Sequence, residues 1–219
     1  MNRLLFEKTG DAVYISHLDL MRLFQRAFKR GGLNLKHTQG FTPRALVSIA
    51  LPLSVGMESV CEILDYELDG QEFDHGEIAA RLNATMPEGV RVRQSYSSNY
   101  KIKNLAKLRC SIRLEYDAGV PENAVDRIRE LFSRESLLVE KKGKNGPVQQ
   151  DIIPMMSDLD VQACGEQEVC ITVTVCAQNP TLNPQQLIAA IAENLPECKP
   201  DFAGIRREET LFPDGTVFR

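Results

Sequence analysis

The chain has 219 residues, of which 43% are hydrophobic and 26% charged, a composition typical of a folded globular protein. Its length fits one large domain or two of about 100 residues. No apolar run reaches the roughly 18 residues of a membrane span, and the first residues become polar too soon for a signal peptide. We therefore expect a cytoplasmic protein that does not bind membranes.

The formal net charge of −4 is unevenly distributed. Residues 1–60 contain eight Lys and Arg residues and four acids, so they carry +4 and the remainder carries −8. This balance argues against indiscriminate polyanion binding, but a local basic face is compatible with a specific anionic partner.

None of the six cysteines is spaced as C-x-x-C, so a zinc ribbon is not expected. The three-cysteine spacing of a radical SAM enzyme is absent too. In a cytosolic chain, free thiols are the usual state. We expect no metal and no cofactor, with free thiols at Cys61, Cys110, Cys164, Cys170, Cys176 and Cys198.

In the first half, hydrophobic periodicity and turn signals predict the order strand, helix, two strands, helix, strand. The strands are expected at residues 3–9, 45–53, 60–68 and 90–96, with a short extra strand at 33–37. The helices are expected at 17–31 and from Asp74 to about Met86. This order is that of the split βαβ, ferredoxin-like arrangement.

The second half repeats the order, with room for an extra hairpin. Strands are expected at 108–115, 137–140, 151–155, 168–177 and 203–211, and helices after Pro121 and Asn183. We predict an α+β fold of two tandem ferredoxin-like (βαββαβ) halves with antiparallel sheets. Residues 1–97 form the first domain, which carries a basic helix, 98–106 the linker and 107–219 the second domain.

The helix at 17–31 is the most informative element of the sequence. Ser16 and Asp19 form a capping box before it, and Gly31-Gly32 ends it. One face carries the apolar residues Leu20, Leu23, Phe24, Ala27 and Phe28. The opposite face carries four cations with only Asp19 among them, namely Arg22, Arg26, Lys29 and Arg30. This face is either a solvated helix surface or a binding surface.

The loop at 39–44 offers an aromatic ring, backbone amides and a guanidinium. Phe41 is suited to stack on a base and Arg44 to hold a phosphate, although Phe41 in the core is an equally good interpretation. The remaining candidate binding residues are polar or cationic. They are Lys36 and Gln39 near this loop, and Lys141, Lys142 and Lys144 in a turn that also reads as a solvated hairpin tip.

Two histidines are candidates for acid–base chemistry. His17 lies at the first helical position, where the helix dipole favours a neutral imidazole, and His37 approaches it if the strand at 33–37 ends beside the helix start. With Arg44 as the phosphate-binding cation, such a pair would suit cleavage of RNA through its 2′-hydroxyl. The plainer interpretation is that His17 packs beside Tyr14.

Several motifs resemble one bacterial family. They are Tyr14 to Arg22, Gln39-Gly40-Phe41-Thr42-Pro43, Ser48 to Leu53, Gly56 to Ser59, and Lys142-Gly143-Lys144 followed by Asp151, Ile152 and Pro154. The chain resembles the radical SAM-linked family of unknown function, although Thr42 and Arg44-Ala45 depart from its usual residues. The resemblance implies a radical SAM enzyme as partner. The architecture is similar to that of tandem ferredoxin-like RNA-processing proteins of CRISPR systems.

We therefore expect a non-catalytic accessory module. It binds RNA (tRNA or rRNA), or a radical SAM enzyme that modifies RNA, or both of these. Two alternatives stay open. One is a metal-independent endoribonuclease that uses His17 or His37. The other is a protein–protein adaptor whose basic face docks on an acidic partner.

Overall fold

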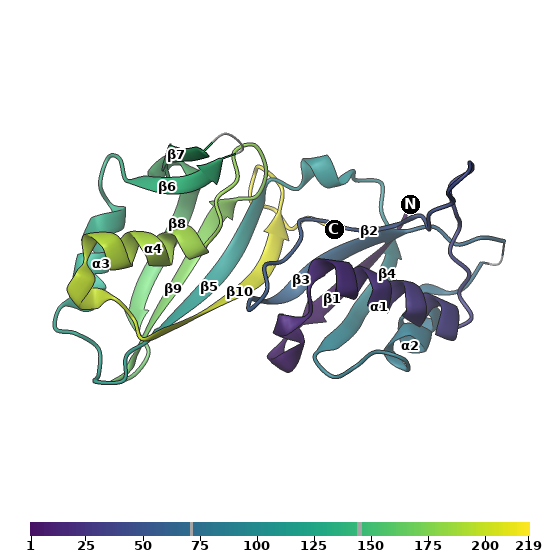
Figure 1. The fold of residues 1–219 in the computed structure, drawn as a ribbon, viewed down its shortest axis with the longest axis horizontal. Coiled ribbons are helices and arrows are strands. Elements are labelled where there is room, and N and C mark those ends of the chain that lie inside the picture. The colour runs from purple at the N-terminus through teal and green to yellow at the C-terminus, as the bar shows by residue number, and fades with distance from the viewer. Residues whose placement is uncertain (71, 144–145) are drawn as a thin grey trace. The chain divides into compact units, whose positions relative to one another are not determined.

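A computed structural model describes residues 1–70, 72–143 and 146–219. The chain divides into two compact units, Met1–Asn104 together with Arg219, and Leu105–Phe218 (Figure 1). Both are mixed α+β structures with antiparallel sheets. No described helix has the length and apolar character that a bilayer crossing requires.

The N-terminal unit has a four-stranded antiparallel sheet in the order β4-β1-β3-β2. Its elements in chain order are β1 (Asn2–Lys8), the 3-10 helix η1 (Gly10–Tyr14), α1 (His17–Arg30), β2 (Val47–Ile49), β3 (Glu58–Tyr66), α2 (His75–Asn83), β4 (Val90–Ser97) and the 3-10 helix η2 (Ile102–Asn104).

Both helices of this unit cover the same face of its sheet, and the core lies between them and the strands (Figure 1). Alternate residues of β1 point into this core, where Leu4 and Phe6 are fully buried. The ring of Phe6 packs edge-on against Phe24 of α1, with 4.7 Å between centroids. The Phe28 ring lies tilted against Tyr66 of β3, with 5.0 Å between centroids, so two aromatic contacts fix α1 on the sheet.

The C-terminal unit repeats this strand order as β10-β5-β9-β8 and adds a separate two-stranded hairpin, β6-β7. Its elements are β5 (Lys107–Glu115), α3 (Ala124–Phe132), β6 (Leu138–Gly143), β7 (Gly146–Asp151), the 3-10 helix η3 (Ile153–Met155), β8 (Met156–Ala163), β9 (Glu168–Cys176), α4 (Gln185–Asn194), the 3-10 helix η4 (Pro196–Cys198) and β10 (Phe202–Leu211).

Four predicted elements differ from the structure. The strand expected at 33–37 is reduced to two isolated bridges, Leu35 with Leu68 and His37 with Ala45. The strand expected at 45–53 is only the three residues of β2, and α2 ends at Asn83 rather than near Met86. The strand expected at 151–155 is wrong, because Pro154 lies in η3 instead.

The expectation of six free thiols is wrong for one pair. Cys164 and Cys170 form a disulfide. Because Gln162 pairs with Cys170 and Ala163 with Val169, Cys164 lies diagonally across from Cys170, and their Cα atoms are 6.0 Å apart, within the range that a disulfide spans. The other four cysteines, Cys61, Cys110, Cys176 and Cys198, form no disulfide within the described residues.

Candidate nucleic-acid interface

Both ends of α1 are closed by local hydrogen bonds. Ser16 is the N-cap, and its Oγ accepts the backbone N–H of Asp19 at 3.2 Å. The Asp19 carboxylate accepts the Ser16 hydroxyl at 2.7 Å, a variation on the expected box. This bond, followed by the contact with Arg22, lowers the pKa of Asp19. At the other end, the N–H of Leu33 bonds the carbonyl of Phe28, and the N–H of Gly32 bonds that of Lys29. These two bonds are the Schellman motif, which the positive φ of Gly32 permits.

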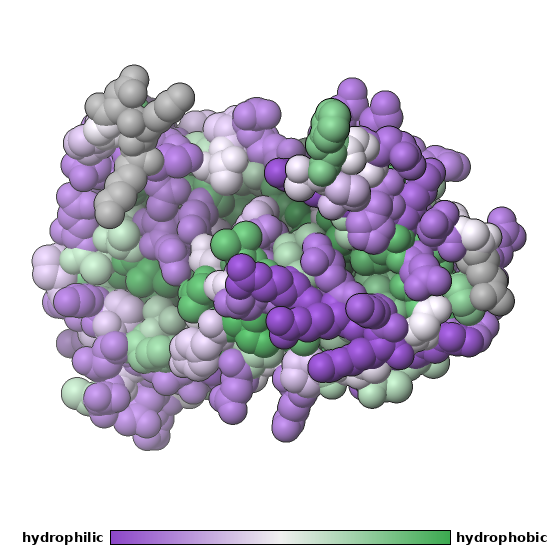
Figure 2. All heavy atoms as spheres, turned by 45° about the vertical axis from the view of Figure 1, so that its right-hand side comes forward, coloured by the Kyte–Doolittle hydropathy of each residue, from purple (hydrophilic) through white to green (hydrophobic). Residues whose placement is uncertain are grey.

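The two faces of α1 are separated as the sequence predicts. The apolar face is buried at Leu20, Phe24, Ala27 and Phe28 and half-buried at Leu23. All four predicted cations are exposed, namely Arg22, Arg26, Lys29 and Arg30. Strongly hydrophilic side chains gather in a band on the face of the N-terminal unit that carries α1 (Figure 2).

Only part of this positive charge is neutralised by the protein itself. Arg22 pairs with Asp19 at 2.9 Å, and Lys36 pairs with Glu67 at 3.3 Å. Within the described ranges, no carboxylate lies within 4.0 Å of the charged groups of Arg26, Lys29 or Arg30. Two successive turns of this helix face therefore present cations that no carboxylate of the described chain neutralises.

The loop at 39–44 projects an aromatic ring into solvent. Phe41 is fully exposed, so the interpretation that it fills the core is wrong. Gln39 and Arg44 are exposed as well. The loop is closed at its base by Thr38, whose N–H bonds the Arg44 carbonyl at 2.8 Å while its hydroxyl accepts the Arg44 N–H at 3.0 Å. A short, closed loop thus carries an exposed aromatic ring three residues from an exposed arginine.

A pocket of about 410 Å³ lies between the C-terminal half of α1 and the segment that follows it. Its apolar lining residues are Phe28, Leu33, Leu35 and Ala45. Its polar groups come from Gln25, Lys29, Asn34 and His37. The sequence predicted Lys29 and His37 as candidates but missed Gln25 and Asn34, because neither amide belongs to a recognisable motif.

The structure does not bring the two candidate histidines together. His17 begins α1 and is half-buried, and its buried Nδ1 has no hydrogen-bond partner in the part of the chain that the structure describes. His37 is exposed and shares the pocket with Lys29, near the other end of the same helix. At 1.5 Å per residue, the helix separates these ends by roughly 18 Å. His17 and His37 therefore do not form an acid–base pair across one phosphate. Tyr14, expected beside His17, is itself 73% exposed.

The predicted cationic turn of the C-terminal unit is described only in part. The ammonium of Lys141 donates to the Thr181 carbonyl at 3.2 Å. The side chain of Lys142 and the whole of Lys144 lie outside what the structure describes. The single lysine that can be placed is engaged with the protein's own backbone.

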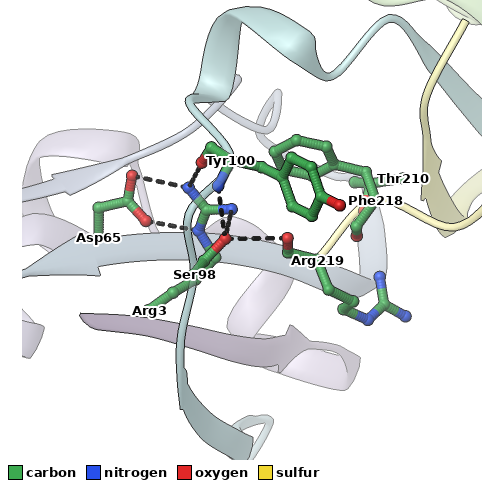
Figure 3. Close-up of polar contacts among 7 residues, drawn as sticks. All are labelled: Arg3, Asp65, Ser98, Tyr100, Thr210, Phe218 and Arg219. Atoms are coloured by element: carbon green, nitrogen blue, oxygen red, sulfur yellow. Dashed lines mark hydrogen bonds and ion pairs between the residues drawn. The ribbon is translucent and has the colours of Figure 1, made fainter. Parts of the chain in front are cut away.

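Two cations of residues 1–60 are not available to any ligand. Arg3 is fully buried, and Figure 3 shows its guanidinium between the Asp65 carboxylate, the Ser98 hydroxyl and the Tyr100 carbonyl. Its Nε–Oδ1 distance to Asp65 is 2.6 Å. Lys8 is buried as well, donates to the Val13 carbonyl, and has its pKa lowered by burial. The charge of +4 in this region therefore includes two cations that stabilise the fold.

A family described as an uncharacterized protein conserved in bacteria (DUF2344) matches residues 2–184. None of the curated proteins compared with the chain matches it. Among solved structures, one chain of a Cbf5-Nop10-Gar1 complex is similar with a TM-score of 0.52 and 13% identity, over 95% of this chain and 48% of that chain. At this identity the likeness concerns the fold alone.

Two further structures are less similar. A chain of the archaeal box H/ACA sRNP Nop10-Cbf5 complex has a TM-score of 0.48 and 12% identity, over 94% of this chain and 46% of that chain. An unknown protein from Galdieria sulphuraria has a TM-score of 0.26 and 12% identity, over 94% of this chain and 97% of that chain. The chain spans about half the length of the first two structures.

Proposed function

The chain belongs to the family of uncharacterized proteins conserved in bacteria (DUF2344), and we propose that it acts as a non-catalytic accessory module that binds RNA, such as tRNA or rRNA. One observation carries the proposal. Arg26, Lys29 and Arg30 are exposed on one face of a helix whose other face is buried, and no carboxylate of the described chain pairs with them. Such a face attracts phosphates by releasing their counterions.

The loop at 39–44 favours RNA over other polyanions. Proteins recognise single-stranded RNA by stacking its bases on aromatic side chains while cations hold the backbone. Phe41 offers a ring without protein contacts on its faces, and Arg44 is exposed three residues away. A heparin-like polyanion has no base to stack, so Phe41 is the residue that separates the two ligand classes.

We further propose that each half is a ferredoxin-like domain. The orders β4-β1-β3-β2 and β10-β5-β9-β8 support this, because each unit joins its strands and helices as the split βαβ motif does, with β6-β7 added to the second. The proposed domains are 1–97 and 107–219, joined by 98–106.

The experiment that tests RNA binding compares two triple charge reversals in the full chain. R26E/K29E/R30E changes the proposed face. R109E/R134E/K199E changes the net charge equally at exposed cations of the other unit that make no ion pair among the described residues. At low salt, the first variant should lose about 100-fold in affinity for single-stranded RNA and the control less than about threefold. Equal losses, or a wild-type chain that retains no RNA, would refute the proposal.

The resemblance to the radical SAM-linked family leads us to propose a radical SAM enzyme as the protein partner. Tyr14, the last residue of η1, and Leu18, in the first turn of α1, support a protein contact, since they are 73% and 66% exposed. After nuclease treatment, the tagged chain should co-purify with a radical SAM enzyme from its own bacterium, and L18E should lose that band. Recovery of the wild-type chain alone would count against this partner.

A further inference from the structure

The pocket beside α1 has walls that the backbone holds in place. The N–H of Lys36 bonds the Glu67 carbonyl at 2.9 Å, and the N–H of Leu46 bonds the Lys36 carbonyl at 2.7 Å. The Asn34 carbonyl accepts the N–H of Asp69 at 2.8 Å. The backbone of the segment opposite α1 is therefore anchored on both sides although it is not a strand.

The chemistry of the pocket is divided between its floor and its rim. Half-buried Leu35 and Ala45 supply the accessible apolar surface of the floor, and Phe28 and Leu33 lie fully buried behind them. The exposed amides of Gln25 and Asn34 each offer two N–H donors and one acceptor. Neither amide has a hydrogen-bond partner within the described ranges.

The charge of the rim selects among ligands. Lys29 contributes an ammonium without an ion pair, and no carboxylate belongs to the described lining. A bound cation finds no carboxylate in the described lining of this pocket, whereas a bound anion can pair with the Lys29 ammonium. An apolar floor with donors and acceptors at its edge suits a flat heteroaromatic ring, and the volume is within the range of small-molecule sites.

We propose that this pocket holds one unstacked nucleobase, whose edge Gln25 and Asn34 read and whose neighbouring phosphate Lys29 binds. The inference rests on the proposed RNA-binding function and deepens it, because it adds a base-recognising site to a face that otherwise contacts phosphates alone. His37 lies at the same rim and offers a further ring nitrogen to the base or its ribose.

The test measures whether the contribution of Asn34 to affinity depends on the presence of bases in the probe. The probes are nine-residue oligoadenylate, oligouridylate and oligocytidylate, and an abasic oligoribophosphate of the same length and charge. N34A should lower the affinity for at least one base-bearing probe about tenfold and leave the abasic probe unchanged, as expected for two groups in contact. N99A removes an exposed amide outside the pocket and serves as the control.

The outcomes separate this inference from the proposed function. Equal effects of N34A on base-bearing and abasic probes, or no effect on either, overturn the base pocket while RNA binding through α1 stands. A second arm uses free AMP, UMP and CMP. One outcome is that the wild-type chain binds a free nucleotide but none of the oligomers, and that N34A abolishes the nucleotide binding. This outcome supports the pocket as a nucleotide site and overturns the RNA function. Binding of none of these probes overturns both.

Discussion

The helices α1 and α3 occupy corresponding places in the two units, each following the first strand of its sheet, yet they treat their cations differently. In α3, Arg127 pairs with Glu197 and Arg129 with Asp126, and Arg129 also donates to the Val161 carbonyl. In α1, the single acid Asp19 pairs with Arg22 and leaves three cations without a carboxylate in the described chain. The same position in the fold thus gives a neutralised face in one unit and an anion-attracting face in the other.

The difference shows that the carboxylates around a basic residue decide its role. Arg3 gives the third case, because Asp65 and two further oxygen atoms surround it in the core. Its charge contributes to the sequence count as much as that of Arg26, but only Arg26 is available to a ligand. Altering these partners should therefore separate the three cases, and the largest effect is expected in the core.

The buried pair should be the most costly to break. Asp65→Ala leaves the guanidinium of Arg3 in the core without its carboxylate, so the free energy of unfolding should fall by about 3–5 kcal/mol. Glu67→Ala removes the exposed partner of Lys36 and should cost less than about 1 kcal/mol. Urea denaturation of both variants measures the difference. Equal costs would show that Arg3 does not depend on Asp65.

The N-caps of α1 and α3 should respond in different ways. Ser16→Ala removes the acceptor of the Asp19 N–H and should lower the free energy of unfolding by about 1 kcal/mol. Asn123, the N-cap of α3, makes no side-chain cap bond and has a φ of 58°, which glycine adopts without strain. Asn123→Gly should therefore change stability by less than about 0.5 kcal/mol. Similar losses in thermal denaturation would contradict this account of α1.

Removing the carboxylates that pair with the arginines of α3 should give this helix an unneutralised basic face like that of α1. D126N/E197Q removes the carboxylates that pair with Arg129 and Arg127, so RNA affinity at low salt should rise by about threefold. E135Q/E193Q makes the same change in net charge at two other exposed acids of the unit. Fluorescence anisotropy with labelled RNA measures both. An equal gain in the control would assign the effect to net charge rather than to pairing.

The smallest effect is expected at alkaline pH in the C-terminal unit. Burial, followed by the nearby charges of Cys198 and Asp201, raises the pKa of Tyr116 to about 12. The phenol donates to the Cys198 carbonyl at 2.9 Å. Because the folded-state pKa lies above the unfolded value, its contribution to stability is present below about pH 10 and is lost as the pH rises toward 12. The stability difference between wild type and Tyr116→Phe should shrink over that interval, and a constant difference would contradict it.

Local patterns in the sequence were enough to predict α1. Ser16, the apolar stripe and Gly31-Gly32 each act within a few residues, and the structure has the cap, the buried face and the glycine ending that they indicate. The exposed cations were also predictable, since the side of a helix opposite its apolar face meets solvent.

Long-range partners were not predictable in the same way. Asp65 lies 62 residues from Arg3, so nothing near Arg3 marks it as buried. The pocket was not predictable either, because Gln25 and Asn34 line it together only once the segment after α1 is anchored to residues 46, 67 and 69. The disulfide depended on the register of β8 and β9, which the cysteine spacing does not reveal.

The salt dependence of RNA binding tests the central claim most directly. Arg26, Lys29, Arg30 and Arg44 are four exposed cations without a carboxylate partner among the described residues, and they predict a slope of log K against log salt of about −3 for single-stranded RNA. In R26E/K29E/R30E the slope should become shallower by about two units. Identical slopes for the wild type and this variant would show that α1 contacts no phosphates and would contradict the account.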